Sequence, residues 1–182
     1  EFCNELDRAV DVAENSEISL KHREKTLKVL CVRKQNSTYK ELAGKFFKAA
    51  EVPKRLKLNI ITPASFKSQD QYQIFPSVRL IYQSLLNRWN TFSDDVSVKE
   101  EDILDKLEKC TSISGYSLKT VPFSLESVKV PAFCGMLTLS IRGHETIRIL
   151  ALSVLCFSEY AGIGIKTAMG MGGVRIGTDN EI

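Results

Sequence analysis

Apolar residues recur along the chain with two periods, one typical of helices and one of strands. The stretches with apolar residues at helical spacing are 2–13, 38–50, 77–92, 103–107 and 146–160. The stretches typical of strands are 27–33, 56–60, 113–123, 128–142 and 174–176. With residues 77–112 set aside as a helical insertion, the order is strand, helix, strand, strand, helix, strand. This order predicts an α+β fold of the ferredoxin-like (RRM-like) βαββαβ type.

Local signals sharpen several of these predictions. Thr38 and Glu41 form a capping box for the second helix, and Thr62-Pro63 is expected to end the strand that starts at 56. The residues that helix 77–92 is expected to bury are Val78, Ile81, Leu85, Trp89 and Phe92. Apolar residues surround most of helix 146–160, so we expect cover on two sides, by a sheet and by an upstream module.

The start of the chain carries no signal for the beginning of a domain. The first helical stripe has no capping residue and no turn before it. We therefore expect Glu1 to lie inside a longer polypeptide, with residues 1–24 forming a helix and a polar linker that belong to an upstream module.

Composition is that of an ordinary globular protein, with 43% hydrophobic and 26% charged residues. No apolar run reaches the length of about eighteen residues that a membrane span needs, so none is predicted. Five cysteines without a Cys-x-x-Cys pair favour reduced thiols and a cytoplasmic location over a disulfide or zinc site. Residues 94–109 hold seven acids and three lysines, a net charge of −4. Because the whole chain has a net charge of +3, the remaining residues carry +7. That excess suits an anionic polymer and suits ordinary solvated lysines equally well.

The densest chemical signal is a glycine-rich stretch after helix 146–160. Two units, Gly162-Ile163-Gly164 and Gly170-Met171-Gly172, flank five residues that include Lys166 and Thr167. Glycines are costly in regular structure, and one compensation is the close approach of a ligand to backbone amides. Such amides can bind phosphate, and a lysine in the loop adds charge. The alternative is a tight helix-to-strand connection that binds no ligand.

The glycine spacing fits neither of the common phosphate-binding loops. A dinucleotide fingerprint requires a glycine near position 167 after a strand, whereas this chain has Thr167 after a predicted helix. A P-loop requires Gly-Lys-Ser/Thr, whereas Lys166 follows Ile165. A metabolic enzyme that binds a nucleotide is therefore the third hypothesis, and stabilisation by mononucleotides but not by RNA would favour it.

Several short motifs, taken in order, carry a resemblance. They are Thr62-Pro63-Ala64-Ser65-Phe66-Lys67, Phe75-Pro76, Ser84-Leu85-Leu86-Asn87-Arg88-Trp89-Asn90, Phe133-Cys134-Gly135 and the glycine-rich stretch. Across roughly residues 25–176 the chain resembles the CRISPR-associated pre-crRNA-processing endoribonucleases of the RAMP superfamily, which have a C-terminal glycine-rich loop. The resemblance implies that residues 25–177 are the second of two tandem ferredoxin-like modules, with the insertion at about 77–112 and a tail at 178–182.

The resemblance also implies a function: binding of CRISPR repeat RNA and metal-independent cleavage of precursor CRISPR RNA within a larger chain. The residues expected to contact RNA are Gly162, Gly164, Lys166, Thr167, Gly170, Gly172 and Arg175, with Lys67 and Arg88 upstream. No cofactor is expected, and the expected partners are repeat RNA, the upstream module and CRISPR effector complex subunits. The alternative is a non-catalytic RNA-binding subunit or scaffold of such a complex.

Cleavage without a metal ion requires a general base. The sequence places neither of the two histidines in a pattern typical of such a base. No metal site is predicted, because these histidines and the scattered acids lack ligand spacing. In the family that the chain resembles, a catalytic histidine typically sits in the upstream module. His22 lies in a polar linker, whereas His144 opens a helix near a strand end and is the candidate for an active-site role, against a local capping role. Neither histidine is carried over from the family.

Overall fold

The computed structural model of the chain describes residues 2–13, 16–20, 24–32, 34, 36–46, 51–93, 98, 102–125 and 128–177. It contains two compact units, an N-terminal unit over Glu1–Ser37 and a main unit over Thr38–Ile182. The division falls after residue 37, whereas the sequence suggested one after residue 24. The predictions for His22, for most of the acidic run 94–101 and for the tail 178–182 lie outside the described residues.

The N-terminal unit consists of a helix and a hairpin. These are α1 (Phe2–Ala13), β1 (Glu17–Leu20) and β2 (Lys25–Lys28). The first helix is confirmed, but part of the predicted linker is the strand β1. The strand predicted at 27–33 was wrong in its bounds and in its place, because β2 pairs antiparallel with β1, not with the main sheet. All side chains of this hairpin are exposed, so no buried face fixes its partner, and a short apolar run alone could not specify one.

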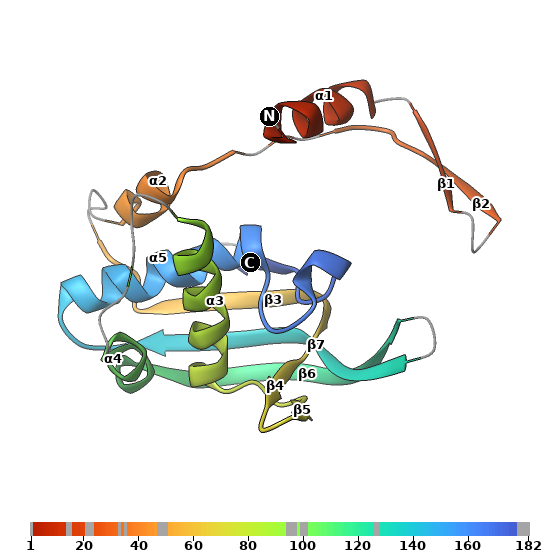
Figure 1. Ribbon diagram of the computed structural model, residues 1–182. Coiled ribbons are helices and arrows are strands. Elements are labelled where there is room, and N and C mark those ends of the chain that lie inside the picture. The colour runs from red at the N-terminus through yellow and green to blue at the C-terminus, as the bar shows by residue number, and fades with distance from the viewer. Residues whose placement is uncertain are drawn as a thin grey trace. The chain divides into compact units, whose positions relative to one another are not determined.

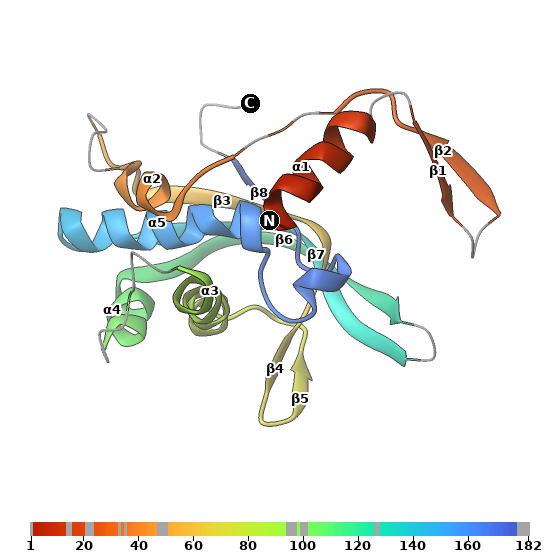
Figure 2. The same ribbon diagram turned by 45° about the horizontal axis from the view of Figure 1, so that its top comes forward.

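The main unit is built on a four-stranded antiparallel sheet in the order β6-β7-β3-β8 (β6, β7 and β3 are labelled in Figure 1 and β8 in Figure 2). The elements of the unit's central plan are β3 (Arg55–Ala64), α3 (Val78–Phe92), β6 (Thr111–Leu125), β7 (Val128–Ile141), α5 (Glu145–Ala161) and β8 (Val174–Gly177). Their order along the chain is βαββαβ, and the first strand lies between the third and the fourth, as in the ferredoxin-like fold. The predicted fold class is confirmed.

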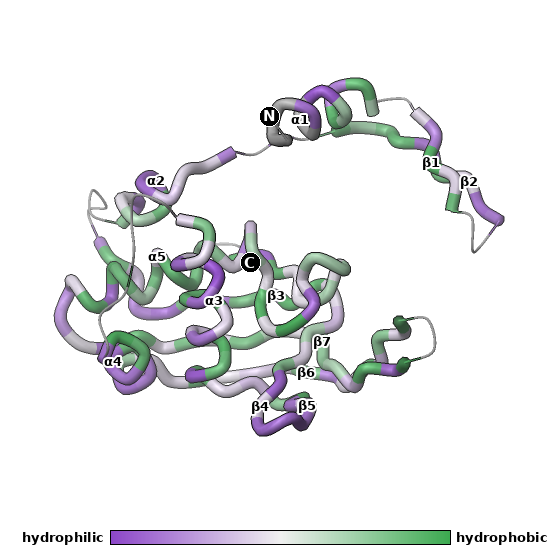
Figure 3. The backbone as a smooth tube through the Cα atoms, in the orientation of Figure 1, coloured by the Kyte–Doolittle hydropathy of each residue, from purple (hydrophilic) through white to green (hydrophobic). Residues whose placement is uncertain are grey.

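The assignment of elements within that fold differs from the prediction. Residues 77–112 are not an insertion, because α3 is itself the first helix of the βαββαβ plan. The additions to the plan are α2 (Tyr39–Gly44), the hairpin of β4 (Phe66–Ser68) and β5 (Gln71–Gln73), and α4 (Ile103–Cys110). The capping box of α2 is present, with the N–H of Glu41 donating to Thr38 Oγ1 at 3.2 Å. Figure 3 shows that the β4–β5 hairpin is hydrophilic.

Helices α3 and α5 lie side by side across one face of the sheet (Figures 1 and 2). The predicted core positions Ile81, Leu85 and Trp89 of α3 are buried and Val78 is half-buried. Phe92, however, is 68% exposed, because α3 ends there. None of the described helices is long and apolar enough to cross a membrane.

Helix α5 is covered on several sides by elements of this chain. Nine of its residues are buried, and it packs against α2, α3, α4 and β8. Tyr39 of α2, Trp89 of α3 and Phe157 of α5 form an aromatic cluster with ring centroids 5.0 to 5.5 Å apart. The sequence predicted that an upstream module covers the side of α5 that the sheet leaves open. In the structure, α2 and the other helices of this chain pack against α5 and cover it instead.

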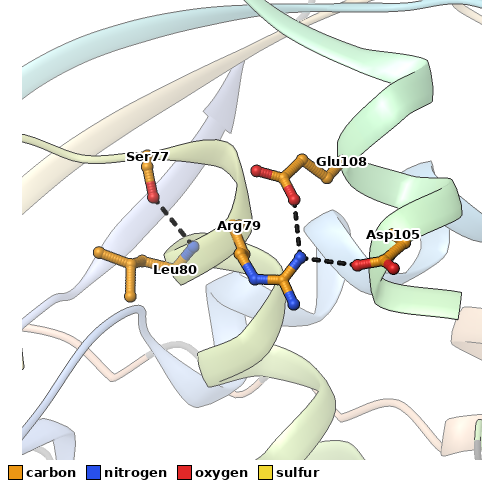
Figure 4. Close-up of polar contacts among 5 residues, drawn as sticks. All are labelled: Ser77, Arg79, Leu80, Asp105 and Glu108. Carbon is orange, nitrogen blue, oxygen red and sulfur yellow. Dashed lines mark hydrogen bonds and ion pairs between the residues drawn. The ribbon is translucent and has the colours of Figure 1, made fainter. Parts of the chain in front are cut away.

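An ion-pair cluster joins α3 to α4. Nη1 of Arg79 lies 2.7 Å from Oδ1 of Asp105 and 2.8 Å from Oε2 of Glu108 (Figure 4). The guanidinium of Arg79 therefore links the two helices through two carboxylates of α4. At the start of the same helix, the N–H of Leu80 donates to Oγ of Ser77 at 3.2 Å, which confirms the predicted beginning of α3.

Candidate nucleic-acid interface

The glycine-rich stretch forms a compact loop between α5 and β8. Its short 3-10 turn (Thr167–Met169) is flanked by Lys166 and Gly170, which both have left-handed backbone conformations with φ of 55° and 87°. Ile163 and Met171 are buried, with 0% and 1% of their surface exposed, and they anchor the two arms of the loop in the core. The loop is therefore a fixed part of the fold.

Most of the loop's amides donate hydrogen bonds within the protein. The four glycine amides predicted to bind phosphate all have acceptors within the protein. Gly162 donates to the carbonyl of Ser158, and Gly170 donates to the carbonyl of Thr167. Gly172 donates to the carbonyl of Pro63, and Gly164 donates to Oγ of Ser84. Ile163 donates to Gly172 at 2.9 Å, and Ile165 donates to Ser65 at 2.9 Å. The expectation that the glycine amides lie open for phosphate is therefore contradicted, because these glycines build the loop.

The loop is seated by two of the motifs that precede it by about a hundred residues. The first is the end of β3, which continues through Thr62-Pro63 where the sequence predicted a strand end. Its pairing register shifts between Ile60 and Ala64, and this irregular segment exchanges hydrogen bonds with the loop. The N–H of Gly173 donates to Oγ1 of Thr62 at 2.7 Å. A proline is tolerated here because the ladder is already interrupted.

The second seat is Arg88, on α3. Its guanidinium donates to the carbonyl of Gly162 at 3.2 Å and to the carbonyl of Gly164. Partial burial lowers the pKa of Arg88, and a guanidinium remains charged at every physiological pH. Arg88 was expected to reach toward RNA, but its donors are directed at the loop. It therefore acts as a clamp that fixes the loop against α3.

The tip of the loop is exposed. Lys166 and Ala168 are exposed and Thr167 is half-buried. Among the described residues, no acceptor is found for the N–H groups of these three residues, and the ammonium of Lys166 has no acidic partner. The loop thus presents one cation and three unpaired donors on a rigid base, which is an arrangement suited to a phosphate group.

The other predicted contacts lie at different places. Lys67, on β4, forms an ion pair with Asp70 at 2.8 Å, and half of its side chain is exposed. Arg175 is exposed on β8 opposite Asn59. Because Val174 is buried beneath the helices and side chains alternate along a strand, Arg175 points to the face of the sheet away from α3 and α5. Arg175 therefore does not join the loop tip, whereas Lys67 lines a pocket together with Ile165, the residue before Lys166.

His144 is far from the loop. It is the residue before α5, whereas the loop begins after α5, and a helix of 17 residues is about 25 Å long. Its exposed side chain lies beside Lys109 and Arg142 at the other end of the molecule's main unit. The two features do not form one active site. Among the described residues, no group of three histidines, cysteines or acids could hold a metal ion.

Sequence reasoning expected Arg88 to contact RNA and did not predict that Arg88 and Ser84 hold the loop. Ser84 and Arg88 are four residues apart, so they share a face of α3, and this spacing was the available signal. A pocket of about 290 Å³ lies next to them, lined in part by Gln83, Asn87 and Ile165. Gln83 and Asn87 stand outside the apolar stripe of the predicted helix, where isolated amide residues give no pattern that indicates a ligand.

The comparisons with known proteins agree with this architecture. The family model described as CRISPR-associated endoribonuclease Cas6 matches residues 58–174. A Cas6 endoribonuclease from Streptococcus thermophilus is 42% identical over 115 residues, which cover 63% of this chain and 47% of that protein. One from Mycobacterium tuberculosis is 28% identical over 133 residues, 73% of this chain and 42% of that protein. The chain thus spans less than half the length of these relatives.

Solved structures share the fold. A Cas6 product complex superposes with a TM-score of 0.77 at 23% identity, covering 95% of this chain and 71% of that one. Thermus thermophilus Cas6 gives 0.66 at 23% identity, covering 77% and 58%. The matched region 58–174 runs from the strand that seats the loop to the first residue of β8, and includes both seats and the loop itself. The chain belongs to the Cas6 family of CRISPR-associated endoribonucleases.

Proposed function

We propose that this chain binds CRISPR repeat RNA at the tip of its glycine-rich loop and takes part in metal-independent cleavage of precursor CRISPR RNA within a larger polypeptide. The observation that carries the proposal is the exposed Lys166 ammonium beside the unpaired amides of Lys166, Thr167 and Ala168. Membership of the Cas6 family supports the identity of the RNA.

The rigidity of the loop supports a positioning role. Cleavage without a metal ion requires the 2′-hydroxyl of the RNA to be aligned with the adjacent phosphorus, and it requires positive charge near the phosphate. The clamp by Arg88 and the seat on β3 hold the Lys166 tip in one place, so a phosphate bound there is fixed relative to the sheet. The glycines contribute by building this support.

The proposal assigns the general base to an upstream module of the same polypeptide, with the main unit as its C-terminal partner. His144 lies about 25 Å along α5 from the loop, so it is not placed to act on RNA held at the tip. The limited share of each curated relative that this chain covers is consistent with a further module. CRISPR effector complex subunits remain further proposed partners.

Cleavage in chelator tests the enzymatic part of the proposal. Labelled repeat RNA is incubated with the full-length protein in excess EDTA, and with a substrate that carries a 2′-deoxy sugar at the cleaved position. We expect a single product that ends in a cyclic phosphate, and no product from the deoxy substrate. Cleavage that occurs only with added Mg²⁺ would contradict the metal-independent mechanism.

A second function, RNA binding without cleavage, is favoured by one observation: among the described residues, no histidine lies beside the loop tip. In this case the protein holds guide RNA as a scaffold. Salt-dependent binding of repeat RNA by the full-length protein, with no product in EDTA or in Mg²⁺, would identify it. Absence of binding would remove both functions.

A further inference from the structure

The pocket next to Ser84 and Arg88 is lined in part by residues of the glycine-rich loop. The space of about 290 Å³ is bounded by residues of β4, by one face of α3, and by Gly164 and Ile165 of the loop. Ile165 directly precedes Lys166, the exposed cation of the loop tip. The cation of the loop tip therefore lies one residue from the pocket lining. The volume is at the lower end of the range for small-molecule sites, so the pocket suits a small planar group.

The charges in the pocket are already neutralised or engaged. Lys67 and Arg88 are the charged residues among its described lining. Lys67 is paired with Asp70 at 2.8 Å, and the guanidinium of Arg88 donates to the carbonyls of the loop. A phosphate in the pocket would have to compete with these partners. The pocket therefore suits a neutral polar group better than an anion.

Two unengaged amide side chains line the same space. Gln83 and Asn87 are four residues apart on α3, so they project from one face of the helix, and both are exposed. Among the described residues, neither side chain has a hydrogen-bond partner. An amide presents a donor and an acceptor together, which matches the edge of a nucleobase. Phe66 and Leu80 supply apolar lining.

We propose that this pocket receives one unpaired nucleobase of the bound RNA, and that Gln83 and Asn87 read its edge. The inference rests on the proposed binding of RNA at the loop tip, and it adds a base-reading site to a phosphate-binding one. Sequence-specific recognition of RNA generally takes place at bases that are free of a duplex, because their edges are accessible. The loop tip then fixes the backbone, and the pocket selects the base beside it.

A panel of repeat RNAs tests this site. Each unpaired position is changed in turn to the other three bases, and binding is measured for the full-length protein and for its Gln83→Ala/Asn87→Ala variant. We expect one position at which the wrong base weakens binding to the wild type by about tenfold or more, and at which the variant discriminates much less. Gln71→Ala, which removes an exposed amide outside the pocket lining, is the matched control and should keep the wild-type pattern.

The outcomes separate the pocket from the loop. Lys166→Ala should weaken binding of every RNA in the panel by a similar factor and leave the base preference intact, because a phosphate contact carries no sequence information. The variant Gln83→Met/Asn87→Leu keeps side-chain bulk and should lose discrimination as the alanine variant does. If wild type and both pocket variants discriminate alike, the pocket is a solvent-filled notch and this inference fails while RNA binding stands. If the wild type binds no repeat RNA, the proposed function itself fails.

Discussion

At the scale of single residues, two glycines of the loop carry different constraints. Gly170 and Gly172 both have positive φ, of 87° and 68°. A Cβ added at Gly170 would meet nothing within 4 Å, whereas one added at Gly172 would lie 2.0 Å from the carbonyl oxygen of Ile163. The first position therefore requires glycine for its backbone conformation alone, and the second requires it also for space.

Alanine substitution at these two glycines should separate the two costs. Gly170→Ala is expected to lower the free energy of unfolding by about 1–2 kcal/mol, the cost of a left-handed alanine. Gly172→Ala should lower it by clearly more, because the backbone of Ile163 must also move. Urea unfolding followed by circular dichroism measures both. Equal losses would contradict the packing of the loop described above.

Arg88 offers a second residue-scale prediction. Arg88→Ala removes the donors to the carbonyls of Gly162 and Gly164, and it should cost about 1–3 kcal/mol of unfolding free energy because partly buried acceptors lose their partner. Arg88→Lys should recover little, since an ammonium lacks the fork that reaches both carbonyls. Arg142, which is exposed, provides the control: Arg142→Ala should change stability by less than about 0.5 kcal/mol. Similar losses for Arg88→Ala and Arg142→Ala would exclude the clamp.

At the scale of elements, the contact between α3 and α4 depends on pH. The hydrogen bond from Arg79, together with its charge, lowers the pKa of Asp105 below its usual value of 3.8. A carboxyl with a lowered pKa in the folded state stabilises the fold at pH above its unfolded pKa, and this contribution is lost as pH falls through the lowered value. The pair is exposed to solvent, so salt should weaken it.

Arg79→Gln should therefore return the pKa of Asp105 toward its usual value. A titration of the side-chain carboxyl by carbon NMR, at low salt, measures the change directly in wild type and variant. Any stability difference between the two proteins should be present at pH 6 and should shrink as pH falls through the lowered pKa of Asp105. An Asp105 titration that is identical in the two proteins would show that the ion pair is not formed in solution.

The spacing of apolar residues predicted most elements of the main unit. It failed where strand pairing or an irregular segment determines the structure. The hydrophobic pattern located α3, α5 and β7 to within one or two residues, because each carries apolar residues at a regular spacing along its whole length. It placed the strand at 27–33 in the wrong sheet, since local sequence does not name a partner strand. It also ended β3 too early at Thr62-Pro63, because a proline at a register shift looks the same in sequence as a strand end.

At the scale of the whole molecule, the candidate site is assembled from segments far apart in sequence. The spacing of glycines indicated a functional loop, and its lysine is exposed as a binding role requires. Of the glycine amides predicted to be free, those of Gly164 and Gly172 are bonded to Ser84 and Pro63, about 80 and 110 residues earlier, and the other two are bonded within the loop or to the end of α5. Only the folded chain brings these acceptors to the loop, so glycine spacing could not distinguish amides that bind a ligand from amides that build the support.

The salt dependence of RNA binding tests the central claim most directly. The logarithm of the association constant for repeat RNA is measured against the logarithm of salt concentration, for the full-length wild type and for Lys166→Ala. The slope should become shallower by about one in the variant, because one phosphate contact and its released counterion are lost. Lys54→Ala, which removes an exposed lysine at the opposite end of β3 from the loop, should leave the slope nearly unchanged. Equal slopes for wild type and Lys166→Ala would contradict the assignment of the loop tip as the phosphate contact.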